Sequence, residues 1–435
     1  DLNAPAVWAM KDTLYVYGST WQSDFPIWKS TNPTKDDWEI AVDTLKVGAW
    51  DPAFFYEESK DKLYLYWGSS NVWPILGTEI NTKTMQSEGY TLPIVRLFPE
   101  DHGWERFGEY NDNVFLPPFI EGAWMTKHNG KYYMQYAAPG TEFSGYADGV
   151  YVSNNPLSRF EYQQHNPFSY KPGGFAHGAG HGATFNDIYG NWWHVSTIFI
   201  SVKNNFERRI GIWPAGFDTD DVMYCNTAYG DYPTLLPEFA KDKDFTKGLF
   251  AGWMLLNYQK PVQVSSTLGG YHTNFAVDED IKTYWSAKTG NKGEWFQTDL
   301  GQISTINAIQ INYADQDVKF KGKTLGKFHQ YKIYGSNDAK KWKLVVDKSN
   351  NKKDVPHDYV ELQKPVEFRY LKIENLHMPT GKFALSGFRV FGKGNTNKPE
   401  KVENFIALRS NPKKYGERRS IWLKWQQNSL ADGYV

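Results

Sequence analysis

Alternating apolar and polar positions run through the first half of the chain and predict a series of short strands. Four alternating segments rich in Tyr, Trp and Val occupy residues 13–20, 62–69, 131–138 and 191–198. A second segment follows each of them, at residues 25–31, 74–80, 149–153 and 208–213. A period of two with aromatic and β-branched side chains is typical of strands, and no stretch of comparable length has a helical period. The pattern therefore predicts an all-β fold.

The predicted strands recur as repeated units. Equivalent aromatic residues lie about 49 to 69 residues apart, a spacing that suits four-stranded propeller blades with loop insertions. Each unit opens with a six-residue frame that aligns with the others, at residues 3–8, 50–55, 120–125 and 180–185. We therefore predict a β-propeller with four visible blades.

The second position of this frame carries the candidate chemistry. It holds Ala4, Asp51, Glu121 and His181 in the four units. Blades around one axis would direct these side chains into one shared cavity, where two carboxyls and an imidazole form a catalytic constellation. The simpler interpretations are a turn-capping role for Asp51, a surface carboxylate for Glu121 and a structural hydrogen bond for His181.

Composition excludes several classes of partner. The net charge is −1 and no Lys or Arg tract stands out, which argues against an electrostatic nucleic-acid partner. The longest apolar runs are too short to span a membrane. The single cysteine, Cys225, excludes an intrachain disulfide and a multi-cysteine metal site. A length of 435 residues predicts more than one domain.

The second half of the chain has a different signature. Residues 237–260 form a charged, irregular connector after the propeller, which we assign to residues 1–236. Residues 261–394 then contain further strand segments at 276–286, 293–301, 331–338, 368–374 and 385–392. This series resembles the discoidin, or coagulation-factor C-type, β-sandwich, a fold shared with carbohydrate-binding modules of family 32. The resemblance implies either a carbohydrate-binding module or a structural domain that braces the propeller.

The same resemblance implies a calcium ion. In that family the ion lies near groups that match Asp278, Asp280 and Thr283, together with a glutamate before the last strand. Gly387 stands at the glutamate position, which argues against the ion.

Residues 395–435 are predicted to be a linker and a partial domain. The segments 402–408, 420–425 and 431–435 resemble the first strands of a fibronectin type III domain. A lone hairpin cannot bury a core, so we expect the carboxyl end to be truncated.

Residues 1–236 resemble glycoside hydrolase family 43, a family of five-bladed propellers that act as inverting glycosidases. The resemblance depends on five motifs in order, at residues 50–55, 121–133, 137–142, 178–182 and 208–218. It implies that Glu121 is the general acid and that Asp51 orients this acid and tunes its pKa. It further implies that His181 helps to hold a water-ligated Ca²⁺, and that Arg208 or Arg209 contacts a sugar hydroxyl.

One part of the family's machinery has no match in the chain. The family's catalytic base is an Asp of the first blade, and the matching residue in the first visible unit is Ala4. We therefore expect residues 1–236 to be blades two to five, with the base upstream of Asp1 and little activity in this chain alone. Asp148 and Glu142 are the other carboxyls that could serve as a base. The alternative is a noncatalytic, glycan-binding propeller.

The substrate is predicted only by class. We expect an exo-acting glycosidase that removes terminal furanosyl or xylosyl residues from polysaccharides, of the α-L-arabinofuranosidase or β-xylosidase type, or else a galactosidase or galactofuranosidase. The insertion at residues 97–106 would shape the pocket rim. Aromatic residues that would line the sugar pocket, or else pack within blades, are Trp21, Trp73, Trp104, Trp124, Tyr146 and Phe175. From the family we expect a secreted, periplasmic or cell-surface monomer without an organic cofactor.

Overall fold

The computed structural model describes residues 3–19, 26–201, 203, 207–228, 230–235, 251–319, 326–395, 400–409 and 421–428. Trp21, residues 237–250 of the predicted connector and residues 431–435 lie outside the described residues. The chain forms two compact units, the first with strands β1–β16 and the second with strands β17–β26. Apart from short 3₁₀ turns, the regular elements in the described residues are strands, so the all-β prediction is confirmed. None of the described helices is long and apolar enough to cross a membrane.

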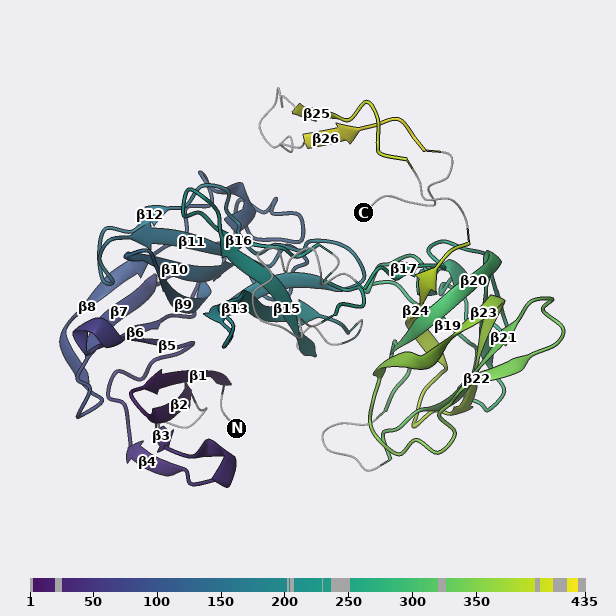
Figure 1. The fold of residues 1–435 in the computed structure, drawn as a ribbon, viewed down its shortest axis with the longest axis horizontal. Coiled ribbons are helices and arrows are strands. Elements are labelled where there is room, and N and C mark those ends of the chain that lie inside the picture. Colours follow the sequence, from purple (N-terminus) through teal and green to yellow (C-terminus); the bar gives the residue numbers. More distant parts are fainter. Residues whose placement is uncertain are drawn as a thin grey trace. The chain divides into compact units, whose positions relative to one another are not determined.

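The first unit consists of four antiparallel sheets, each with four strands in chain order (Figure 1). The first two sheets contain β1 (Asn3–Met10), β2 (Thr13–Ser19), β3 (Ile27–Ser30), β4 (Glu39–Val42), β5 (Ala53–Glu57), β6 (Lys62–Trp67), β7 (Ile75–Ile80) and β8 (Ser87–Val95). The next two contain β9 (Glu121–His128), β10 (Lys131–Ala138), β11 (Ala147–Ser153), β12 (Glu161–Tyr162), β13 (His177–Asn186), β14 (Trp192–Phe199), β15 (Arg208–Phe217) and β16 (Met223–Cys225). These sheets are the four predicted blades.

Alternation along the strands explains why the blades pack face to face. In β1 the side chains of Ala6, Trp8 and Met10 are buried while those between them are exposed. The Trp8 ring stacks on Phe54 of the next blade, with the ring centroids 3.9 Å apart. Each aromatic ring buries a large apolar area, and this burial stabilises the packing of one blade against the next. The 17% aromatic content is thus used to join one blade to the next.

The four blades follow an arc (Figure 1). The innermost strand of each blade contacts that of the next, from β1 to β5, β9 and β13. The blades at the two ends carry apolar side chains that are exposed in the structure. Val7 and Ile40 are 47% and 55% exposed on the first blade, and Ile210 and Ile212 are 80% and 48% exposed on the last.

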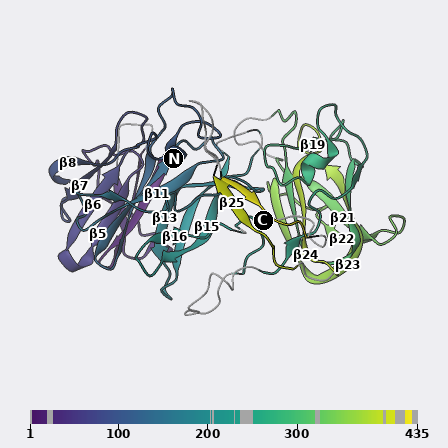
Figure 2. The same cartoon turned by 90° about the horizontal axis from the view of Figure 1, so that it is seen from above.

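The second unit is built from one eight-stranded antiparallel assembly (Figure 2). Its strands are β17 (Met254–Leu255), β18 (Val262–Val264), β19 (Trp285–Ser286), β20 (Trp295–Tyr313), β21 (Gln330–Ser336), β22 (Lys343–Asp347), β23 (His357–His377) and β24 (Ala384–Lys393). The long strands β20 and β23 pair along most of their length, with register shifts where they bend. The core includes the buried side chains of Trp285, Phe296 and Phe388. A separate hairpin, β25 (Ile406–Arg409) and β26 (Ile421–Lys424), is the described part of the predicted partial domain.

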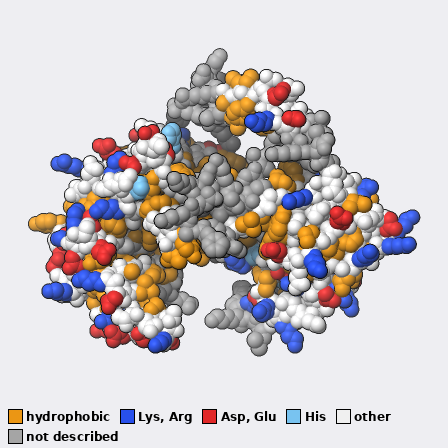
Figure 3. Space-filling view, viewed as in Figure 1, with side chains coloured by type: hydrophobic (Ala, Val, Ile, Leu, Met, Phe, Trp, Pro, Cys, Tyr) orange, Lys and Arg blue, Asp and Glu red, His pale blue; other side chains and the backbone are white. Residues whose placement is uncertain are grey.

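A buried arginine anchors the second unit. Arg389 of β24 is 2% exposed and makes a bidentate ion pair with Glu279, at 2.8 and 2.7 Å. It also donates to the carbonyl oxygen of Asp231 at 2.6 Å and to Gln310 Oε1 at 2.7 Å. Charged side chains are otherwise scattered over the visible surface of both units and form no single patch (Figure 3).

Candidate active site

The aligned frame positions share an unusual backbone conformation. Ala4, Asp51 and His181 have φ values of 42°, 48° and 52°, in the left-handed region. In the third blade the left-handed residue is Gly122, immediately after Glu121, with φ 66°. Residues other than glycine rarely adopt such values, and strained positions of this kind cluster at functional sites. The frame read from the sequence is therefore a repeated backbone feature.

Irregular strand pairing accompanies this conformation. The register shifts within β1 between Asn3 and Ala6, within β9 after Glu121, and within β13 around His181. In the second blade, Asp51 and Pro52 come directly before β5. A β-bulge bends its strand and re-aims a side chain, which is why bulges are common next to active sites.

The structure brings the three polar frame residues together. One side-chain donor atom from each of Asp51, Glu121 and His181 lies within 4.8 Å of the other two. Asp51 is 9% exposed, and Glu121 and His181 are half-buried. The sequence predicted this convergence from the frame alone.

Burial is the main influence on the Glu121 carboxyl. Loss of hydration raises its pKa, because the charged form is disfavoured away from water. His181 opposes this shift, whereas the negative charge of Asp51 adds to it. A hydrogen bond from Tyr146 and the charge of Arg208 lower the pKa by smaller amounts. The net direction is upward, toward a carboxyl that keeps its proton.

Tyr146 holds the Glu121 carboxyl in place. The Tyr146 hydroxyl donates to Glu121 Oε1 at 2.5 Å, and the Tyr146 side chain is 1% exposed. Ser69 Oγ lies 3.5 Å from the other oxygen, Oε2. Since Oε1 accepts the tyrosine proton, the acidic proton of Glu121 belongs on Oε2. Tyr146 was predicted to line the sugar pocket, and in the structure it orients the carboxyl.

Three glycines make room for this arrangement. A Cβ atom on Gly122 would lie 2.9 Å from the His181 Cα atom, and one on Gly180 would lie 2.7 Å from the ring of Tyr146. A Cβ atom on Gly182 would lie 2.3 Å from the His194 ring. The Gly-His-Gly sequence at residues 180–182 is therefore required by close packing on both sides of His181.

A buried polar chain lies behind this segment. His194 and Asp148 have side chains that are 0% exposed, with His194 Nε2 3.1 Å from Asp148 Oδ2. The same Asp148 oxygen accepts the Gly182 N–H at 2.9 Å. Thr184 Oγ1 donates to Gln135 Oε1 at 3.0 Å and lies 2.9 Å from His194 Nδ1.

This burial bears on Asp148 as a candidate base. A base must reach a water molecule, and Asp148 is enclosed and already bonded to the backbone beside His181. The sequence held one signal for this buried polar network, namely polar residues at the inward-facing positions of alternating strands.

The first unit matches a known protein family. The profile of the family described as "Glycosyl hydrolases family 43" matches residues 2–223, just over half of the 435 residues. The chain belongs to glycosyl hydrolase family 43. A second profile, "F5/8 type C domain", matches residues 261–387. No curated protein matches the chain.

Solved structures of low sequence identity include other family 43 proteins. A structure titled "Glycoside hydrolase" is 17% identical with a TM-score of 0.49, and the match covers 90% of this chain and 84% of that one. The family 43 protein BlXynB of Bacillus licheniformis is 14% identical with a TM-score of 0.41, and coverage is 90% and 86%. An α-L-arabinofuranosidase of Clostridium thermocellum is 17% identical with a TM-score of 0.37, and coverage is 52% and 72%.

The two predicted arginines lie in different surroundings. Arg208 Nη1 donates to Thr141 Oγ1 at 2.7 Å, and its charge acts on Glu121. Arg209 forms an ion pair with Glu207 at 3.2 Å, and its side chain is 43% exposed. Arg208 is therefore the one coupled to the candidate site of this family 43 propeller.

The predicted aromatic residues are spread over the propeller. Trp104 packs against Tyr136 and donates to the Tyr162 hydroxyl at 2.8 Å, while Trp124 donates to the carbonyl oxygen of Thr184 at 2.9 Å. These are contacts of packing within and between blades. Phe175 is 1% exposed. Trp73 is 72% exposed and lines a separate pocket.

The resemblances imply two calcium ions, one in each unit. Calcium takes six to eight oxygen ligands. His181 offers nitrogen, and Glu121 accepts a hydrogen bond from Tyr146, so this group does not form a direct calcium cage. A water-mediated role for His181 stays a prediction.

The second unit offers an equally poor fit. Asp278 accepts hydrogen bonds from the Thr283 hydroxyl at 2.7 Å and from the Asp280 N–H at 3.1 Å. Burial raises the pKa of Asp278 to about 6. Gly387 lies within β24 and has no side chain to offer. These residues do not supply the carboxylate set that the resemblance implies.

Proposed function

We propose that the chain carries the general acid of an exo-acting, inverting glycosidase that removes terminal furanosyl or xylosyl residues from polysaccharides. The observation that carries the proposal is the convergence of Asp51, Glu121 and His181 within 4.8 Å on a family 43 propeller. Galactosidase or galactofuranosidase activity is the alternative within the same fold.

In this proposal Glu121 protonates the oxygen of the departing sugar. An acid must hold its proton near the working pH, and burial together with the Asp51 charge raises the Glu121 pKa in that direction. Tyr146 occupies Oε1, so the transferred proton comes from Oε2. Arg208 would contact a substrate hydroxyl beside this carboxyl.

Asp51 tunes and orients the acid in this proposal and is not the base. An inverting enzyme needs its base about 6.5–9.5 Å from the acid, because a water molecule and the sugar ring lie between them. The Asp51 and Glu121 oxygens within 4.8 Å of each other leave no such room. The first visible blade has Ala4 at this frame position and offers no carboxylate there, so we expect residues 1–435 alone to hydrolyse little or nothing.

The test is a panel of nitrophenyl arabinofuranoside, xyloside, galactoside and galactofuranoside substrates. It is run with the 435-residue chain and with any longer form that its gene encodes. Hydrolysis of one glycoside by either form, abolished by Glu121→Gln, supports the proposal. Hydrolysis that survives Glu121→Gln on substrates with poor leaving groups would refute the role of Glu121.

A noncatalytic glycan-binding propeller is the second candidate. The observation that favours it is Ala4, whose backbone has the same left-handed conformation as Asp51 and His181 but which offers no carboxylate. Saturable oligosaccharide binding without turnover in any form of the chain would favour this candidate. With either function we expect the second unit to act as an accessory glycan-binding or bracing domain, and the protein to work outside the cytoplasm as a monomer.

A further inference from the structure

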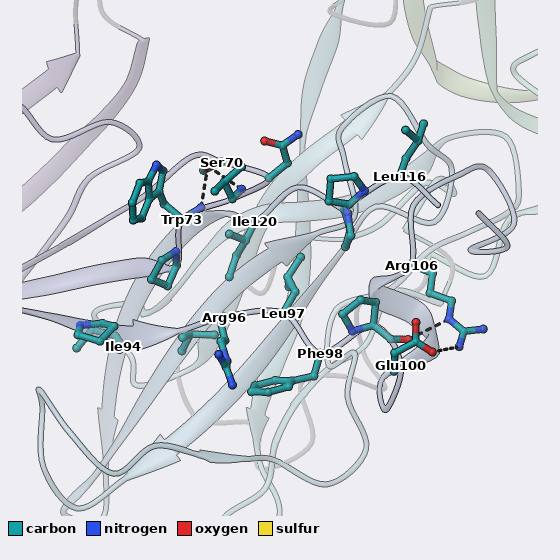
Figure 4. Close-up of a pocket in the computed structure, with 18 of the residues that line it drawn as sticks. Ser70, Trp73, Ile94, Arg96, Leu97, Phe98, Glu100, Arg106, Leu116 and Ile120 are labelled. Atoms are coloured by element: carbon teal, nitrogen blue, oxygen red, sulfur yellow. Dashed lines mark hydrogen bonds and ion pairs between the residues drawn. The ribbon is translucent and has the colours of Figure 1, made fainter. Parts of the chain in front are cut away.

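A pocket of the first unit is separate from the three converging frame residues. It has a volume of about 890 Å³ and lies between the second and third blades. Its walls come from residues 70–74, 93–100 and 113–118, with Ile120 at the base (Figure 4). Trp73 and Leu116 lie on opposite sides of this space, with Ile120 and Leu97 between them (Figure 4). A volume of this size is typical of small-molecule sites.

The loop that follows β6 places this pocket on the same face of the propeller as the candidate acid. Strand β6 ends at Trp67, and the Gly68 N–H donates to the carbonyl oxygen of Trp50, next to Asp51. The following loop pairs with the start of the third blade, because Ser70 and Ile120 exchange backbone hydrogen bonds of 3.0 and 2.9 Å. Ile120 directly precedes Glu121, so one wall of the pocket adjoins the acid.

Two aromatic side chains of the pocket lining are largely exposed to solvent. Trp73 and Phe115 are 72% and 91% exposed. Both are presented by short turns, since Ser70 Oγ accepts the Trp73 N–H at 3.0 Å and Asn113 Oδ1 accepts the Phe115 N–H at 2.9 Å. Exposed apolar groups gathered in one groove indicate a binding surface.

Polar groups of the pocket complement these rings. The guanidinium of Arg96 lies 4.6 Å from the Phe98 ring centroid and makes no ion pair with the described residues. Arg106, by contrast, donates to the Pro99 carbonyl at 3.0 Å and to Glu100 at 3.3 Å. Sugar rings offer apolar CH faces to aromatic rings and hydroxyls to guanidinium and amide groups, so the lining suits a glycan.

The wall formed by the insertion is held rigidly. Glu105 is 0% exposed, accepts the Phe98 N–H at 2.6 Å and accepts the Tyr136 hydroxyl at 2.5 Å. The Asn111 side chain donates to the carbonyl oxygens of Trp104 and Arg106 at 2.8 and 2.9 Å. A preformed wall lowers the entropy lost on binding.

We propose that this pocket binds the leaving-group side of the substrate, namely sugar residues of the glycan chain beyond the bond that is cleaved. The proposal rests on the assignment of Glu121 as the general acid. An acid protonates the oxygen that stays with the leaving group, so the rest of the glycan leaves the site on the acid's side, where Ile120 and Ser70 form the pocket wall.

The test measures binding, without turnover, by calorimetry on the full 435-residue chain. The probes are xylohexaose and α-1,5-arabinohexaose, each compared with its disaccharide. We expect one hexasaccharide to bind at least about tenfold more tightly than its disaccharide, a gain expected of a few buried ring contacts. Trp73→Ala or Phe115→Ala should remove that gain and leave disaccharide affinity unchanged.

Tyr90→Ala is the matched control, because Tyr90 is an 88% exposed aromatic residue of the same blade outside the pocket. It should leave both affinities unchanged. Equal affinity for long and short probes, or a length-dependent gain that survives Trp73→Ala and Phe115→Ala, would overturn the proposal. Neither result depends on hydrolysis, so a failure here is separate from a failure of Glu121 as the acid.

Discussion

The clearest test of the site concerns the charge that Asp51 places beside Glu121. Asp51→Asn removes this negative charge and keeps the shape of the side chain. Because the Asp51 charge raises the Glu121 pKa, the substitution should lower that pKa. Tyr146→Phe should do the opposite, because the Tyr146 hydrogen bond favours the ionised form of Glu121.

The distance between the two carboxyls sets the size of the Asp51 effect. The two carboxyls approach within 4.8 Å, and at that limit two like charges repel by about 0.9 kcal/mol in bulk water and by about 3.5 kcal/mol at an effective dielectric constant of about 20. Asp51 is 9% exposed, which favours the upper part of this range. Repulsion of this size should give a clear displacement of the titration curve.

The assay is a ¹³C NMR titration of glutamate carboxyls in the 435-residue chain, with the Glu121 signal assigned by its loss in Glu121→Gln. It needs no turnover and is therefore independent of whether the chain carries a base. Asp51→Asn should move the Glu121 midpoint to lower pH and Tyr146→Phe to higher pH. A midpoint that stays unchanged in Asp51→Asn, or moves in the same direction in both variants, would refute the electrostatic account.

Four further predictions concern activity and stability. Glu121→Gln, in an active form of the enzyme, should slow cleavage of poor leaving groups by about 10²–10⁴-fold and affect activated aryl glycosides much less, as measured by kcat/KM on both substrate types. The pKa of Glu121 is raised in the folded state, so the wild type loses stability as the pH rises through that pKa. Glu121→Gln should therefore be more stable than the wild type at neutral pH but not at acid pH, as measured by urea unfolding. Gly182→Ala should destabilise the first unit by about 1–3 kcal/mol through overpacking, whereas Gly173→Ala, with open space around its Cβ, should not. Arg389→Met leaves Glu279, whose side chain is 14% exposed, without its partner and should cost up to about 3 kcal/mol of the second unit's unfolding free energy. A loss below about 1 kcal/mol would contradict the anchoring role.

The strands and the repeated frame were legible in the sequence because they depend on local pattern. The period-two segment predicted at residues 131–138 is β10, and the segment predicted at 74–80 contains β7. Alternation reflects which side of a sheet is buried, and that information is present in each short segment. The frame likewise placed Asp51, Glu121 and His181 together, since equivalent positions of repeated blades face the same axis.

The roles of other residues were decided only by the tertiary structure. Tyr146 looked like one aromatic residue among many, and only the meeting of its loop with the third blade's first strand places its hydroxyl 2.5 Å from Glu121. In the sequence Asp148 was a candidate base, whereas in the structure it lies beside His194 and is completely buried. Trp73 and Phe115 are 42 positions apart in the sequence, and the insertion between two blades brings them to one pocket. Such contacts join segments that are distant in the sequence. They depend on which side chains pack around each residue in the folded protein, and no periodic pattern in the sequence reports them.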